Sequence, residues 1–110
     1  MSAQSTQSPA MAEAQAIAEL SREGFAAGAY DYPAGKTEPH SHDYDVCLHI
    51  LSGEFRLGLV EEGVVRSFGP GERLLVPAGT LHFEDHDALR MVVGRRRPED
   101  GGASDPTRGA

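Results

Sequence analysis

The chain has 110 residues and a mass of 11.7 kDa, which is room for one domain. Its 17 acidic residues outnumber its 10 basic ones, and the net charge of −7 argues against nucleic acid or an anionic membrane as a partner. The single cysteine, Cys47, excludes an internal disulfide and a multi-cysteine zinc site. No stretch approaches the roughly 20 apolar residues that span a bilayer, and the polar start is unlike a signal peptide, so we expect a cytoplasmic protein.

Residues 1–24 are expected to form a polar N-terminus and an accessory helix. Ser8 can cap this helix, Pro9 can occupy its first turn, and Gly24 is a typical stop. The apolar residues of the helix recur at every third position: Met11, Ala14, Ile17 and Leu20. Because this stripe is thin, we expect the helix to lie on a larger body rather than to be stable alone.

Residues 25–97 alternate short apolar runs with Gly, Pro and Asp, which is typical of an all-β sandwich or barrel. The expected strands are 25–32, the stretch around 40–42, 46–51, 54–60, 64–68, 73–76, 81–84 and 89–95. Glu61-Glu62-Gly63 predicts a hairpin turn. The Arg95-Arg96-Arg97 triplet is expected to be a solvated strand end, and residues 98–110 a disordered tail.

The five histidines lie in two short segments, 40–49 and 82–86. Side chains two residues apart in a strand point to the same side, so His40 and His42 can approach one metal ion. His82 can complete this set from a facing strand. Taken alone, the His40-Ser41-His42 tripeptide is better explained by exposed or hydrogen-bonded loop histidines.

Two motifs in these segments resemble those of the cupin superfamily. The residues that fit the first motif are Gly35, His40, His42 and Gly53, and those that fit the second are Gly71, Pro77, Gly79 and His82. His86 stands where the second motif ends in Asn. The resemblance covers residues 25–97 and implies a cupin double-stranded β-helix, a jelly-roll barrel, with the short N-terminal helix added.

The resemblance also implies a divalent transition metal, Fe, Mn, Ni or Zn, bound by His40, His42 and His82. The glutamate ligand of the first motif is replaced by Val46. A three-histidine site with water in its open positions would resemble cupin dioxygenases that lack the carboxylate. Alternatively, the site is degenerate and binds no metal.

A fourth ligand from elsewhere in the chain is the remaining alternative. Glu84 and His86 share the strand phase of His82, and Asp45 can reach the site if a bulge shifts its register. Glu84 and His86 are also the candidates for a catalytic general acid or base. Cys47 is expected in buried strand packing, and His49 on the barrel exterior or in a subunit interface.

Two classes of function follow from the resemblance. The first is a metalloenzyme of dioxygenase, lyase or isomerase type that acts on a small organic molecule. The second is a non-catalytic ligand-binding or sensory cupin, with or without metal. A homodimer formed through residues 25–32 or through the final strand is expected in either case, because a small sheet leaves edges open.

The barrel is expected to enclose a small, mostly apolar pocket with a polar end. Depending on strand phase, the candidates for its lining are Phe55, Leu57, Leu59, Leu74, Val76, Met91 and Val93. We expect no lysine or arginine in this pocket.

Overall fold

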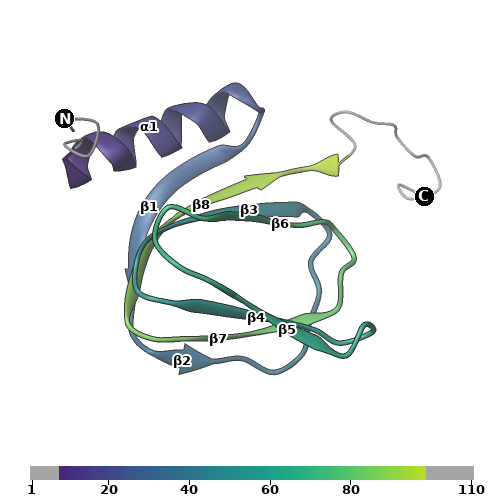
Figure 1. Ribbon diagram of the computed structural model, residues 1–110. Coiled ribbons are helices and arrows are strands. Elements are labelled where there is room, and N and C mark those ends of the chain that lie inside the picture. Colours follow the sequence, from purple (N-terminus) through teal and green to yellow (C-terminus); the bar gives the residue numbers. More distant parts are fainter. Residues whose placement is uncertain (1–7, 99–110) are drawn as a thin grey trace.

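A computed structural model describes residues 8–98 and shows one helix packed outside a β-barrel (Figure 1). The strands are β1 (Ala26–Tyr32), β2 (Gly35–Lys36), β3 (Asp45–Ser52), β4 (Phe55–Leu59), β5 (Val64–Phe68), β6 (Arg73–Val76), β7 (His82–His86) and β8 (Leu89–Arg96). They form two antiparallel four-stranded sheets, ordered β1-β8-β3-β6 and β2-β7-β4-β5. The predicted all-β barrel with a short N-terminal helix is confirmed. The predicted tail falls outside the described residues apart from Pro98.

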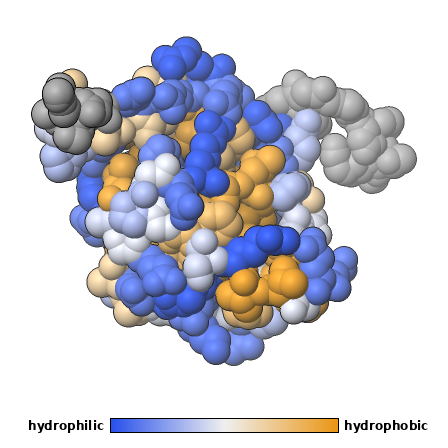
Figure 2. Space-filling view, in the orientation of Figure 1, coloured by the Kyte–Doolittle hydropathy of each residue, from blue (hydrophilic) through white to orange (hydrophobic). Residues whose placement is uncertain are grey.

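The main core lies between the two sheets. Its buried residues are Val46, Leu48, Ile50, Phe55, Leu57, Leu74, Val76, Leu89, Met91 and Val93. They come from both sheets because alternate side chains of each strand point to the same side. Figure 2 shows this apolar material between the sheets, inside a mostly hydrophilic rim.

The helix α1 (Pro9–Arg22) begins as predicted, because the Ser8 Oγ accepts a hydrogen bond of 3.1 Å from the Met11 N–H. It lies on the outer side of the sheet that contains β1, β8 and β3 (Figure 1). Its buried residues are Ala16 and Leu20. None of the helical segments among the described residues is long and apolar enough to cross a membrane.

The predicted contact stripe of α1 is partly wrong, because Met11 is 60% exposed and Ala14 is exposed. The helix instead packs through its second half, over Gly94 of β8. A Cβ at Gly94 would lie 2.9 Å from the Phe25 Cβ and 3.4 Å from the Leu20 Cδ1. The missing side chain of Gly94 therefore sets where the helix can approach the sheet.

Most predicted strands agree with the structure within two residues, but the stretch around 40–42 does not form a strand. His40 makes one isolated antiparallel bridge, to His82. The preceding residue, Pro39, has no N–H to donate to a ladder, which accounts for the interruption. β7 in turn extends to His86, two residues past its expected end.

The final strand, β8, lies between β1 and β3 and not at an edge of its sheet. The predicted dimer contact through this strand is therefore wrong, because both of its hydrogen-bonding sides are already paired. β1 is an edge strand. A homodimer formed through residues 25–32 stays a prediction.

Gly53, between β3 and β4, combines a positive φ of 86° with close packing. A Cβ there would lie 2.6 Å from the Leu89 Cβ and 2.7 Å from the Ala88 carbonyl oxygen. Gly63, between β4 and β5, also has a positive φ, 71°, but nothing lies within 4 Å of its added Cβ. The two glycines therefore differ in crowding and not in backbone conformation.

We expect Gly53→Ala to lower the free energy of unfolding more than Gly63→Ala. Each substitution carries the cost of a left-handed residue, about 1–2 kcal/mol, and Gly53→Ala adds a clash with backbone atoms. Urea unfolding followed by circular dichroism measures both losses. Equal losses would show that crowding at Gly53 does not contribute.

Candidate metal and ligand site

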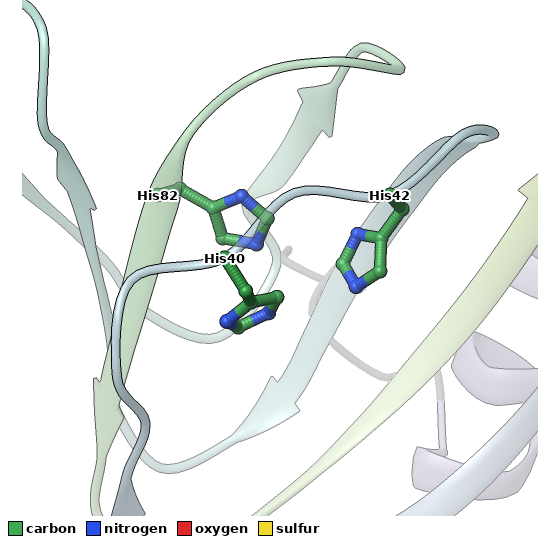
Figure 3. A group of neighbouring side chains, drawn as sticks. All are labelled: His40, His42 and His82. Atoms are coloured by element: carbon green, nitrogen blue, oxygen red, sulfur yellow. The ribbon is translucent and has the colours of Figure 1, made fainter.

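Three histidines meet where the segment before β3 crosses the start of β7. Figure 3 shows the rings of His40, His42 and His82 gathered around one point, and one ring nitrogen from each lies within 4.8 Å of the others. The His40 N–H donates to the His82 carbonyl at 2.8 Å, and the His82 N–H donates back at 2.9 Å. The His42 carbonyl accepts from the Gly79 N–H at 2.8 Å. Main-chain hydrogen bonds therefore fix the two segments that carry the rings.

Two of the rings are also oriented by carbonyl groups. The His40 Nδ1 lies 2.7 Å from the Glu38 carbonyl oxygen, and the His82 Nδ1 lies 2.9 Å from the Thr80 carbonyl oxygen. A carbonyl oxygen can only accept, so each Nδ1 carries the proton. The neutral rings then keep their lone pair on Nε2, which is the arrangement found around metal-binding histidines.

His42 is half-buried, and its ring stacks on Tyr44 with centroids 5.0 Å apart. Burial lowers the pKa of His42 below its ordinary value, and His82 and His40 lower it further because two nearby imidazolium ions would repel. The neutral ring, which is the form that binds metal, is therefore favoured at neutral pH.

Glu84, on β7, extends toward the same nitrogens. Its Oε2 lies 3.5 Å from the His82 Nε2 and 3.9 Å from the His40 Nε2. The Glu84 N–H donates to the Thr37 Oγ1 at 2.9 Å, which holds its backbone against the segment after β2. Of the additional ligands considered from the sequence, Glu84 is the one whose carboxylate the structure brings to the three histidines.

Asp45 does not join this group. Its Oδ1 accepts from the Ala78 N–H at 2.9 Å, and its Oδ2 pairs with Arg96 at 3.3 Å. The register shift in β3 lies near its other end, between Ile50 and Ser52, so it does not redirect Asp45. Asp45 as a ligand is therefore wrong, whereas Val46 faces the barrel interior, as the motif position requires.

His86 lies farther along β7, apart from the three-histidine cluster. Its ring stacks on Phe55 with centroids 5.8 Å apart and meets Tyr32 edge-on at 6.2 Å. Its Nδ1 lies 3.0 Å from the Asp87 carbonyl oxygen, so that nitrogen donates. His86 is placed in the wall of the pocket, and its role as an acid or base stays a prediction.

Cys47 and His49 alternate with the inward-facing residues of β3. Cys47 is 1% exposed and belongs to the apolar cluster between α1 and the sheet. Burial raises the pKa of its thiol, and the Arg73 Nε donates to its Sγ at 3.1 Å. Buried strand packing of Cys47 is therefore confirmed, and His49 shares its strand phase, outside the barrel interior.

A cavity of about 200 Å³ opens between the sheets beside these histidines. Its lining residues are Tyr32, His42, Tyr44, Val46, Leu48, Val76, His82, Glu84, His86, Met91, Val93 and Arg95. A wider depression of about 780 Å³ shares His42 and Tyr44 with this cavity. The cavity thus has an apolar wall and places the candidate polar groups in one small space.

The predicted lining was partly wrong. Val76, Met91 and Val93 do line the cavity, whereas the other candidates do not: Phe55, Leu57, Leu59 and Leu74. Phe55, Leu57 and Leu74 are core residues, with Leu59 packed against them. Leu74 and Val76 have the same strand phase and both face the core, so the position of a residue along its strand, and not its phase, decides this difference.

The expectation of a pocket without arginine was also wrong, because Arg95 lines the cavity. The arginine triplet is a solvated strand end as predicted, since Arg95 and Arg97 are exposed, but that prediction did not show that Arg95 also borders the cavity. The alternation Met91, Val93, Arg95 along β8 was the signal that could have found it.

Comparisons with known proteins give structural likenesses alone. A scan against protein-family models found no match, and neither did a search of curated proteins. The solved polyketide cyclase RemF from Streptomyces resistomycificus is 25% identical, with a TM-score of 0.55, and the match covers 74% of this chain and 63% of that one.

Two further solved structures are less similar in sequence. A cupin-2 domain protein from Shewanella frigidimarina is 16% identical, with a TM-score of 0.57 over 66% of this chain and 71% of that one. A putative ethanolamine utilization protein Q from Salmonella typhimurium is 20% identical, with a TM-score of 0.57 over 71% of this chain and 62% of that one. The match spans less than two thirds of RemF and of the ethanolamine protein. With its antiparallel barrel and both histidine segments in place, the chain has the fold of a small cupin domain.

Proposed function

We propose that this protein binds a divalent transition metal through His40, His42 and His82 and acts on a small organic molecule in the adjoining cavity. The observation that carries the proposal is the convergence of one ring nitrogen from each histidine within 4.8 Å. The carbonyl groups that orient His40 and His82 support it, because they leave each Nε2 free as a ligand. Imidazole nitrogen suits iron, nickel and zinc, and manganese remains a candidate with an added carboxylate.

Glu84 is the fourth ligand in this proposal. Its distances of 3.5 Å and 3.9 Å to the His82 and His40 Nε2 atoms support the assignment, because these are the atoms freed for the metal. Glu84 would thereby supply from β7 the carboxylate that Val46 cannot supply from β3. Its negative charge would offset part of the charge of the cation.

When bound, the metal would supply a Lewis acid that polarises a substrate oxygen and lowers the pKa of water. The apolar wall, which includes Val76, Met91 and Val93, would keep water from the body of the substrate. His86 would be available there to hold or move a proton. We assign a reaction of dioxygenase, lyase or isomerase type, and the likeness to a polyketide cyclase supports an enzymatic role.

The histidine site can be tested by elemental analysis of the purified, untagged protein. We expect about one metal ion per chain in the wild type and its loss during purification of His40→Ala and His42→Ala, because each variant keeps only two of the three imidazole ligands. Both rings are half-buried, so these variants are preferable to changing His82, which is 1% exposed. His49→Ala is the matched control and should keep its metal.

Circular dichroism would establish that each variant is folded before its metal content is compared. Equal metal content in all four proteins would contradict the assignment. So would a wild type that takes up no metal after anaerobic loading with iron, manganese, nickel and zinc in turn. Metal binding without turnover of any substrate would support the metal site but contradict the enzymatic role, and would favour a binding protein.

Glu84→Gln tests the fourth ligand, because it keeps the side-chain shape and removes the charge. We expect the affinity for Zn²⁺ to fall by about 10-fold or more, measured by competition with a chromophoric chelator. Asp85→Asn is the matched control, since Asp85 is the next residue on β7 and pairs with Arg56 at 3.4 Å. An unchanged affinity in Glu84→Gln would remove Glu84 from the ligand set and leave the three histidines.

A further inference from the structure

Arg95 contributes a cation to the wall of the cavity. It follows Met91 and Val93 at alternate positions of β8 and lines the same cavity, although the residue, unlike those two, is exposed. Within residues 8–98, its guanidinium makes no hydrogen bond or ion pair. The two arginines that follow it do have partners: Arg96 pairs with Asp45 at 3.3 Å and Arg97 with Asp43 at 3.5 Å.

The residue directly across the sheet from Arg95 is Val46, on β3. Both line the cavity, so an apolar side chain occupies the place where a carboxylate would have neutralised the arginine.

A guanidinium in this position favours a planar anion, because its parallel N–H groups match the two oxygens of a carboxylate. The other features of the cavity indicate which kind of anion would bind. The cavity measures about 200 Å³, and aliphatic side chains such as Val46, Val76 and Met91 form part of its wall, which suits a small molecule with a hydrocarbon body. Glu84 contributes a negative charge to the same wall, so a dianion such as phosphate would be repelled more strongly than a monocarboxylate.

We propose that the cavity takes a small monocarboxylate, whose carboxylate group binds Arg95 while its apolar body lies against Val46, Val76 and Met91. This inference rests on the proposed function for its catalytic meaning, since the same cavity would be the substrate site. The anion site itself needs no metal. Arg95 is then the residue that selects acids over their neutral analogues.

The test is isothermal titration calorimetry of the full chain with two matched pairs of probes, phenylacetate with phenylacetamide and hexanoate with hexanamide. It is made on chelator-treated protein, because a bound metal would itself attract a carboxylate. We expect the wild type to bind at least one acid about 10-fold more tightly than its amide, the effect of one charge-assisted contact. Arg95→Gln should lose that preference.

Arg97→Gln is the matched control, with the same change of charge two residues away and outside the cavity lining. It should keep the preference for the acid. Val46→Glu supplies a second test, because it places a carboxylate opposite Arg95 and should abolish the preference while leaving the arginine in place. Thermal unfolding would establish that each variant is folded.

No preference for the acid in either pair, or a preference that survives Arg95→Gln, would overturn the inference. Elemental analysis of untreated protein separates this failure from failure of the proposed function. Metal bound by the three histidines without a preference for acids would overturn the role of Arg95 alone. A preference lost in Arg95→Gln, in a protein that binds no metal, would support the anion site and contradict the metal site.

Discussion

Two reciprocal backbone hydrogen bonds between His40 and His82 hold the candidate site together. They join the segment before β3 to the first residue of β7, so that distant parts of the chain share one point of the barrel. Because main-chain atoms make these bonds, the separation of the rings is set by the sheet and not by flexible side chains. Ligands held in advance in this way lose little freedom when a cation binds.

The alternation of side chains along β3 and β8 divides the molecule into two environments. Cys47 and Val92 face outward and are buried under α1, whereas Val46 and Val93 face the cavity. The helix therefore covers the back of the sheet without entering the site. Glu84 and Arg95, which carry opposite charges, line the same small cavity.

The sequence predicted those parts of the fold that depend on local chemistry. Ser8 caps the helix, and Gly53 has the positive φ expected of a tight turn. The meeting of His40 and His42 with His82 was also expected, but for a reason that the structure corrects. The first two belong to an interrupted segment after Pro39, and main-chain bonds to His82 and Gly79 bring them to the site.

What the sequence could not supply was the position of each residue along the barrel and the choice of partner for each charge. Asp45 is a plausible ligand by composition, but the Ala78 N–H and Arg96 occupy its two oxygens. Arg95 is indistinguishable from its neighbours in a run of three arginines until the register of β8 shows which side it faces. Pairing across sheets depends on contacts between distant segments, which local patterns do not encode.

Anomalous diffraction from crystals of the metal-loaded protein, at the absorption edge of the bound metal, tests the central claim most directly. The account predicts one peak about 2.0–2.2 Å from a ring nitrogen of His40, of His42 and of His82, with a Glu84 oxygen in the fourth position. A peak at His49, or one at His86 that lacks these three histidines, would contradict it.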